Sequence, residues 1–292
     1  MKVPVQVEGR TLVLSNLDKV LYPAAGFTKA EVIDYYSRIA PVLLPHLADR
    51  ALTRKRYPDG VDGQVFFEKN APRGTPDWVR TVTLPSPGSS KQRETIDYVV
   101  CDDLPTLVWT ANLAALELHT HMWRVMRTKD VARRPDLLVL DLDPGPPATI
   151  VECCEVALLL RERLGADGLE PVVKTSGSKG MQLYARAPRG KDTNDYAKAI
   201  AQELEKARPD LVVHRMAKDL RPGKVLVDWS QNSPAKTTVT VYSLRARERP
   251  TVSTPVTWDE VAACTSPSEL VFVTDDVLAR VAAHGDLFAP LL

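Results

Sequence analysis

A short apolar segment that ends in two aspartates limits the fold of this chain more than any other feature. Residues 137–145 read LLVLDLDPG, so a buried-strand pattern runs into Asp141 and Asp143 before Pro-Gly closes it. Side chains two apart on a strand face the same way, and close carboxylates repel each other unless a cation lies between them. The segment therefore predicts a core strand with a carboxylate site for Mg²⁺ or Mn²⁺. Alternatively, Asp143 caps a helix or lies in a solvated turn.

A second acidic strand end strengthens this interpretation. The segment VLVDW places Asp228 after another apolar run. Three carboxylates from two adjacent strands suit a two-metal site for phosphoryl transfer, in which the ions lie ~3.5–4 Å apart. The alternative is that Asp228 is an ion-paired residue at a sheet edge.

A glycine- and serine-rich loop suits a phosphorylated ligand. Residues 175–180, TSGSKG, lack the spacing of a Walker A motif. Their small side chains, exposed amides and lysine can nevertheless cradle a triphosphate. A plain hairpin turn is the alternative.

Basic and aromatic residues lie close together elsewhere in the chain. Arginines and lysines cluster at residues 54–56, with Phe66 and Phe67 shortly after them, and arginines recur at residues 245–249. A cation beside an aromatic ring suits a nucleotide, whereas a solvated basic face above a core phenylalanine is the simpler explanation. For the H-x-H pair His119 and His121, we expect one histidine near phosphate and the other outside the site, with zinc binding as the alternative.

Composition excludes several classes of protein. With 44% hydrophobic and 26% charged residues, most of the 292-residue chain cannot be disordered. No apolar run approaches the ~20 residues of a membrane helix, and no N-terminal segment resembles a signal peptide, so we expect no membrane contact and a cytoplasmic location. The net charge of +1 excludes a strong global attraction to nucleic acid but allows a local basic track. The four cysteines lack C-x-x-C spacing, which favours buried thiols over a zinc ribbon.

Helical and strand patterns are interspersed without a regular βαβ repeat, which predicts an α+β protein. Thr28 and Glu31 have capping-box spacing before an apolar stripe, so we expect a helix from Thr28 that Pro45 ends. The alternating residues 119–125 predict one strand.

We expect one domain over residues 1–292. The loop PSPGSS at residues 85–90 is the best internal boundary. It would separate an N-terminal lobe, residues 1–90, from a catalytic core, residues 91–292.

The order of motifs resembles the polymerase domain of bacterial ATP-dependent DNA ligase D, a member of the archaeo-eukaryotic primase superfamily. The matching strings begin with SNLDKVLYP at Ser15 and end with YSLR at Arg245. Between them lie TRKRYPDG, FFEK, ALELH, LDLDPG, TSGSKG, VLVDWSQNS and KTT. The likeness covers nearly the whole chain, and LDLDPG, SGSKG and VDWSQN in this order are highly specific together.

The resemblance implies two apposed, mostly antiparallel sheets flanked by helices, with a primase-like catalytic core and an active cleft between the sheets. It implies template-dependent addition of ribo- or deoxyribonucleotides to a primer 3′-hydroxyl at DNA gaps, overhangs or ends in non-homologous end joining, using two Mn²⁺ or Mg²⁺ ions. Ku and a DNA ligase are the implied protein partners, and the implied location in the cytoplasm is with the nucleoid. A catalytically weak scaffold that binds DNA 5′-phosphate ends is the alternative.

Roles for individual residues also follow from the resemblance. The implied metal ligands and catalytic residues are Asp141, Asp143 and Asp228. The implied nucleotide-binding residues are Lys55, Phe67, His119, Ser176, Lys179, Gln231 and Arg245. The residues implied to grip the 5′-phosphate of a downstream strand are Asn16, Lys19 and Lys29.

One departure from the family's pattern and the lack of one ligase motif matter for function. The family motif SGSKG-x-His carries Gln182 at the histidine position, and glutamine can donate a hydrogen bond to phosphate but cannot carry charge. The chain lacks the K-x-D-G motif of a ligase nucleophile, since three residues separate Lys55 from Asp59. We therefore expect no ligase activity of this chain, which is either a stand-alone protein or an excised domain.

Overall fold

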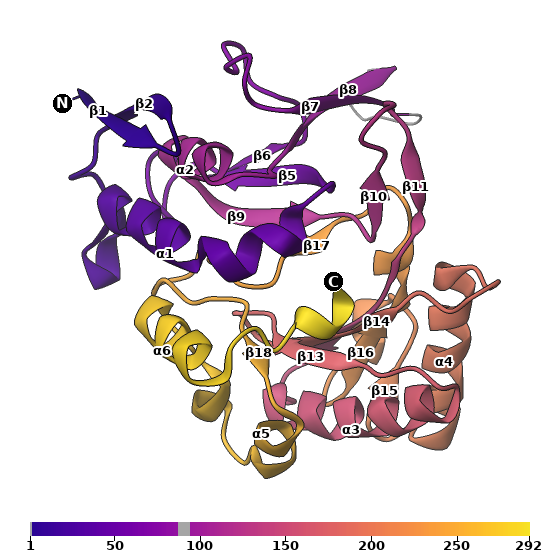
Figure 1. The fold of residues 1–292 in the computed structure, drawn as a ribbon. Coiled ribbons are helices and arrows are strands. Elements are labelled where there is room, and N and C mark those ends of the chain that lie inside the picture. The colour runs from indigo at the N-terminus through magenta and orange to yellow at the C-terminus, as the bar shows by residue number, and fades with distance from the viewer. Residues whose placement is uncertain (1, 87–93) are drawn as a thin grey trace.

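Two sheets form the centre of the structure, a computed structural model that describes residues 2–86 and 94–292. They lie one above the other in Figure 1. The acidic sheet contains, in spatial order, β15 (Val212–Val213), β16 (Val225–Asp228), β12 (Leu137–Pro144), β14 (Met181–Arg186), β13 (Val172–Thr175) and β18 (Pro255–Val256). The facing sheet contains β17 (Thr238–Val239), β9 (Ala115–Thr120), β5 (Ala51–Arg56), β8 (Thr95–Val100) and β7 (Thr81–Pro85), with β6 (Phe66–Glu68) paired to β5.

Helices flank both sheets. The strand pairs of the two sheets are antiparallel except for β15 with β16, so the predicted α+β fold with two mostly antiparallel sheets is confirmed. The helices are α1 (Lys29–Leu47), α2 (Leu104–Asn112), α3 (Ile150–Ala166), α4 (Thr193–Ala207), α5 (Trp258–Ala263) and α6 (Thr274–His284). Figure 1 shows α3 and α4 on the outer side of the acidic sheet, away from the facing sheet.

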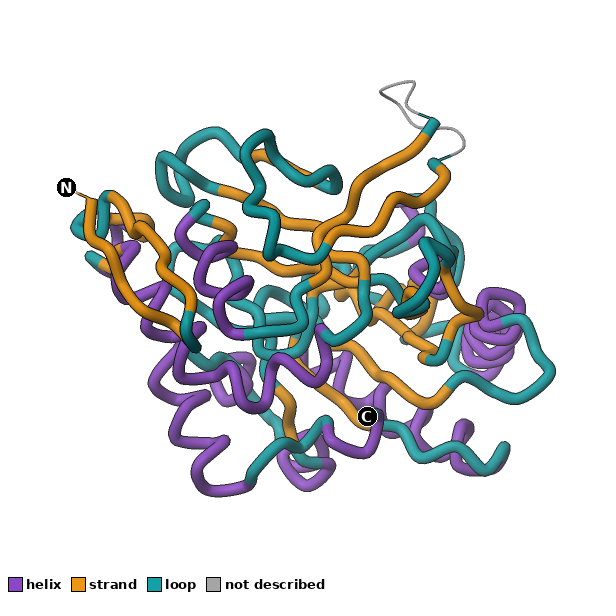
Figure 2. The backbone as a smooth tube through the Cα atoms, turned by 45° about the horizontal axis from the view of Figure 1, so that its top comes forward, coloured by secondary structure: helices purple, strands orange, loops and turns teal. Residues whose placement is uncertain are grey.

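Three two-stranded sheets complete the described fold. They pair β1 (Lys2–Val7) with β2 (Arg10–Ser15), β3 (Val20–Tyr22) with β4 (Phe27–Thr28), and β10 (Trp123–Val125) with β11 (Ala132–Pro135). Figure 2 shows the β1–β2 hairpin at one edge of the molecule, beside the N-terminus and outside the two central sheets.

The alternation of β12 decides where its aspartates point. Leu138, Leu140 and Leu142 are buried in a core shared with α3 and α4. Val139 faces the other way and belongs to the core that includes α1 and the facing sheet. Because side chains alternate along a strand, Asp141 lies on the Val139 side. The sequence pattern thus directs the carboxylate between the two sheets.

Two predicted element boundaries are wrong. The Thr28–Glu31 capping box is present, but α1 continues through Pro45 to Leu47. The proline removes one backbone donor, and the fully buried side chain of Leu47 holds the last turn against the core.

The segment 119–125 is divided between two sheets rather than forming one strand. β9 ends at Thr120, and β10 pairs with β11 from Trp123. The amide of Leu137 donates to the carbonyl of Met122, which ties this break to the start of β12. The proposed boundary near residues 85–90 extends beyond Ser86 into residues outside those described.

All four cysteines are buried and free, which confirms the expectation of buried thiols. Within residues 2–86 and 94–292, no helix combines the length and apolar character needed to cross a membrane.

Candidate active site

Three carboxylates leave one face of the acidic sheet at neighbouring positions. β12 and β16 run antiparallel with Asp141 opposite Asp228, and Asp143 follows two residues after Asp141. Opposed residues and residues two apart share a face, so the three side chains lie on the same side of the sheet. The two acidic strand ends read from the sequence therefore come together in the fold.

Burial and neighbouring negative charges oppose the ionisation of Asp141 and Asp143, the two carboxylates on β12. Burial is the largest cause that raises the pKa of Asp141; the charge of Asp143 raises it further, and a hydrogen bond from Gln182 opposes the rise. Desolvation, followed by the charge of Asp228, also raises the pKa of Asp143. A cation between the strands would relieve both effects, which is the behaviour expected of metal ligands.

Hydrogen bonds from its own chain neighbours hold the third carboxylate. Asp228 Oδ1 accepts from the amide of Ser230 at 2.9 Å and from its hydroxyl at 2.5 Å, and Oδ2 accepts from Gln231 Nε2 at 2.7 Å. Among the described residues, no group of three or more His, Cys, Asp or Glu side chains is arranged to hold a metal ion. The donor set itself, hard carboxylate oxygens on adjacent strands, fits Mg²⁺ or Mn²⁺.

The serine-glycine loop between β13 and β14 is seated on the acidic strand. Ser176 Oγ accepts hydrogen bonds from the amides of Ser178 and Gly180 at 3.2 and 3.3 Å. A Cβ on Gly180 would lie 1.9 Å from the carbonyl oxygen of Leu142, so only glycine allows this close approach. The exposed Lys179 therefore lies next to the acidic strand end.

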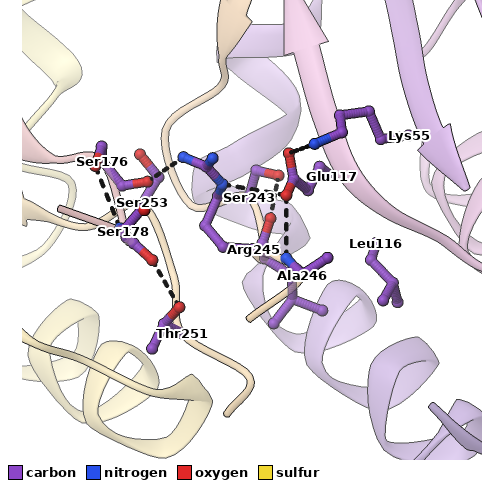
Figure 3. A network of polar contacts seen from close by, with 12 residues as sticks. Lys55, Leu116, Glu117, Ser176, Ser178, Ser243, Arg245, Ala246, Thr251 and Ser253 are labelled. Atoms are coloured by element: carbon purple, nitrogen blue, oxygen red, sulfur yellow. Dashed lines mark hydrogen bonds and ion pairs between the residues drawn. The ribbon is translucent and has the colours of Figure 1, made fainter. Parts of the chain in front are cut away.

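A buried glutamate of the facing sheet contacts several basic residues that lie across from the carboxylates of the acidic sheet (Figure 3). Glu117 accepts hydrogen bonds from Lys55 Nζ at 3.0 Å, His119 Nε2 at 2.9 Å and the amide of Ala246 at 3.1 Å. Arg245 Nε lies 3.4 Å from the same carboxylate. Three cationic or titratable side chains thus converge on one anion.

Arg245 also reaches across to the acidic sheet. Its Nη1 donates to the carbonyl of Ser176 at 2.5 Å, and Figure 3 shows its side chain between that loop and Glu117. Burial alone would raise the pKa of Glu117, but the hydrogen bond from His119 and the charges of Arg245 and Lys55 outweigh it and hold this pKa well below its usual range. Glu117 is therefore a permanent anion beneath a basic surface.

The two walls enclose a cleft of about 400 Å³. Its lining residues are His119, Asp141, Asp143, Ser176, Ser178, Lys179, Gln182, Gln231, Thr237, Thr238, Val239, Arg245 and Arg247. Phe67 stands at its edge with 52% of its surface exposed, and its ring centre is 6.4 Å from that of His119. His121 lies outside the cleft, buried and stacked on Trp123 at 4.2 Å. This arrangement agrees with the expectation of one histidine inside the site and one outside.

The three residues associated with a 5′-phosphate lie together at the start of α1. The amide of Lys19 donates to the carbonyl of Asn16, and the amide of Lys29 donates to the carbonyl of Lys19. Lys29 Nζ is bonded to the carbonyl of Ser15 at 2.6 Å, and Lys19 Nζ pairs with Asp59 at 2.8 Å. The structure thus brings the three residues into one cluster, with both ammonium groups already in contact with oxygen.

One known family matches most of the sequence. The family model described as the primase-polymerase domain of LigD covers residues 28–288. The chain belongs to this family. A structure described as the polymerase domain from Mycobacterium tuberculosis ligase D in complex with DNA matches with a TM-score of 0.89 and 42% identity, over 96% of this chain and 97% of that one.

Longer proteins contain similar LigD domains. The multifunctional non-homologous end joining protein LigD of Mycolicibacterium smegmatis is 44% identical over 282 residues, which is 95% of this chain and 36% of that protein. The bifunctional non-homologous end joining protein LigD of Bacillus subtilis is 33% identical over 279 residues, which is 94% of this chain and 43% of that protein. The chain therefore spans less than half of the length of these relatives.

Sequence reasoning missed two polar residues of this LigD primase-polymerase domain. Glu117 is two residues before His119, so strand alternation alone could have placed both on one face. Lys174 is a lysine in the apolar run PVVK, and it is 1% exposed beneath the cleft residue Gln182. A charged residue inside a core-strand pattern was the available signal.

Proposed function

We propose that the chain is a template-dependent nucleotidyltransferase that adds ribo- or deoxyribonucleotides to a primer 3′-hydroxyl. The observation that carries the proposal is the pairing, across one cleft, of a carboxylate row with a basic cradle. Asp141, Asp143 and Asp228 form the row on the acidic sheet. Arg245 and His119, anchored by Glu117, form the opposite wall. Membership of the LigD primase-polymerase family supports this assignment.

In the proposed reaction the primer 3′-hydroxyl oxygen forms a bond to the α-phosphorus and releases its proton to solvent. The bond between the α-phosphorus and the oxygen that bridges it to the β-phosphate breaks, and pyrophosphate leaves with that oxygen. Lys179 and Arg245 oppose the negative charge of the leaving pyrophosphate. Ser176 shapes the loop that carries Lys179, and Gln231 offers an amide near Asp228. Phe67 stands where a base can stack beside a triphosphate held at His119.

Asp141, Asp143 and Asp228 would hold two Mn²⁺ or Mg²⁺ ions. When bound, such ions supply Lewis-acid stabilisation of the attacking and leaving oxygens. The carboxylates of this chain position that charge, and the basic wall orients the triphosphate from the other side.

The cluster of Asn16, Lys19 and Lys29 is proposed to bind the 5′-phosphate on the far side of a gap. A pocket of two ammonium groups and one amide gives a nearly neutral protein a local grip on a DNA end. Such an enzyme would fill gaps and overhangs in double-strand break repair by non-homologous end joining, with Ku and a DNA ligase as partners.

Gap filling on a primed template with a downstream strand tests the proposal. We expect extension that requires Mn²⁺ or Mg²⁺, stops with a chelator, and is faster when the downstream strand carries a 5′-phosphate. Each nucleotide type is supplied separately to measure sugar preference. Absence of extension, with phosphate-dependent DNA binding retained, would overturn the polymerase assignment. Gln182 favours that alternative, a scaffold that binds DNA ends.

The 5′-phosphate preference should weaken as the pH rises from 7 to 9. Burial, together with the charges of Lys19 and Arg56, lowers the pKa of Lys29 to about 8. Below pH 8 the ammonium attracts phosphate, and above it the neutral amine does not, so the preference should fall by up to about tenfold at pH 9. Fluorescence anisotropy of gapped DNA with and without the 5′-phosphate measures it.

The matched control for this experiment is Lys29→Arg, because a guanidinium stays charged across the whole range. That variant should keep a pH-independent preference. An equally steep fall in both proteins would show that Lys29 is not the titrating group.

A further inference from the structure

A polar row crosses the acidic sheet beneath the cleft. On four adjacent strands Lys174 lies opposite Gln182, Gln182 lies opposite Asp141, and Asp141 lies opposite Asp228. Directly opposed residues share a face, so the four side chains form one line from β13 to β16. Only part of this line belongs to the carboxylate site, and Lys174 lies at its far end.

Lys174 is buried and donates to two oxygens. Its Nζ lies 2.5 Å from Gln182 Oε1 and 2.6 Å from Ser253 Oγ. The hydroxyl of Ser253 donates its own proton to the carbonyl of Thr175 at 2.9 Å, so its oxygen is an acceptor toward Lys174. An amine provides two N–H donors in either protonation state, which makes both contacts directional.

These contacts fix which end of the Gln182 amide faces the carboxylates. Lys174 donates to the carboxamide oxygen, and the amide nitrogen is left for Asp141, which lies directly opposite Gln182 on β12 and lines the same cleft. A reversed amide would set N–H against N–H at Lys174 and oxygen against oxygen at Asp141. The orientation of Gln182 is therefore determined from the buried side, mainly by Lys174, with a longer contact of 3.5 Å from the Tyr184 hydroxyl to the same oxygen.

We propose that Lys174 is a positioning residue of the carboxylate site that acts through Gln182. It holds the amide nitrogen toward Asp141, which keeps that carboxylate in one orientation and leaves its remaining lone pairs for a cation. The inference rests on the proposed function, because it gives Asp141 the role of metal ligand. Groups that orient metal ligands typically change metal affinity roughly 10- to 100-fold when removed.

A double-mutant cycle with Mn²⁺ as the probe tests the proposal. Lys174→Met and Gln182→Met remove one member each, and the K174M/Q182M protein removes both. Mn²⁺ binding is measured on the full chain by electron paramagnetic resonance, without DNA or nucleotide, and thermal unfolding checks that each variant folds. Lys206→Met, at an exposed position of α4, is the matched lysine control.

We expect K174M and Q182M each to weaken Mn²⁺ binding by roughly 10- to 100-fold, and the double variant to be no weaker than either, because both act on one contact. Lys174→Gln keeps two N–H donors and should bind Mn²⁺ nearly as tightly as wild type. It also keeps the test decisive if K174M does not fold.

Three results would overturn the inference. The first is that Q182M or K174M binds Mn²⁺ with wild-type affinity. The second is that the fold-losses of Mn²⁺ affinity in the two single variants multiply in the double variant. The third is that K174Q binds Mn²⁺ as weakly as Q182M. Asp141→Asn separates this inference from the function beneath it. If Mn²⁺ binds D141N as tightly as wild type, the assignment of Asp141 as a metal ligand is wrong, and the proposed role of Lys174 is wrong with it. Lost binding in D141N with unaltered K174M and Q182M would reject the role of Lys174 alone.

Discussion

Asp141→Ala should reduce primer extension by about a thousandfold or more while leaving DNA binding intact. The expected loss follows from the position of Asp141 opposite Asp228 and two residues before Asp143, where it would help to hold the proposed ions. Removing several kcal/mol of charge stabilisation from a transition state has an effect of this size. Single-turnover extension with saturating nucleotide and DNA measures it, and anisotropy measures DNA binding.

Folding provides an independent check on the same variant. Because burial and, after it, the charges of Asp143 and Asp228 destabilise ionised Asp141, the variant should unfold at a temperature no lower than wild type in metal-free buffer. Asp259→Ala, at an exposed position in α5, is the matched control and should extend primers normally. Extension by D141A at a rate comparable to wild type would reject the metal-ligand assignment.

Glu117→Gln should have the second-largest effect: it should lower the free energy of unfolding and, separately, the turnover number. The carboxylate is 2% exposed and faces Lys55, His119 and Arg245. Removing one partner of a buried ionic network leaves the others uncompensated, so the free energy of unfolding should fall by about 3–5 kcal/mol. Chemical denaturation measures this change.

In Glu117→Gln, the negative charge of a bound nucleotide triphosphate should replace part of the lost charge of Glu117. The basic wall becomes more positive, so the triphosphate should bind at least as tightly as in wild type and raise the unfolding temperature more. The turnover number should nevertheless fall, because Arg245 and His119 lose the anion that positions them. Loss of nucleotide binding with turnover unchanged would contradict this account of Glu117.

The sequence predicted the acidic row well because the row depends on local patterns. The alternation of LLVLDLD assigns Asp141 to one face without knowledge of any partner. The meeting of Asp141 with Asp228 depends on the register of two strands more than eighty residues apart; two similar acidic strand ends suggested it, and the resemblance to a family supported it.

The buried polar residues were harder to predict for a physical reason. Of the three partners of Glu117, only His119 is close in sequence; Lys55 comes from β5 and Arg245 from a distant segment, so the local pattern does not reveal the two basic partners. Lys174 depends on Ser253, 79 residues away. The predicted end of α1 was wrong for a similar reason. Pro45 is a local signal for the end of a helix, but the burial of Leu47 in the core keeps the helix going past it.

Arg245 has a consequence for how the family can diverge. Its guanidinium donates to the carbonyl of Ser176 on the acidic sheet and lies beside Glu117 on the facing sheet. Both contacts persist only at one distance between the two sheets. The exposed faces of the outer helices do not affect this spacing, whereas their buried residues support the acidic sheet. A substitution remote from the cleft that moves one sheet against the other changes the alignment of carboxylates and cradle without touching either. Selection on activity therefore extends to packing positions that no substrate meets.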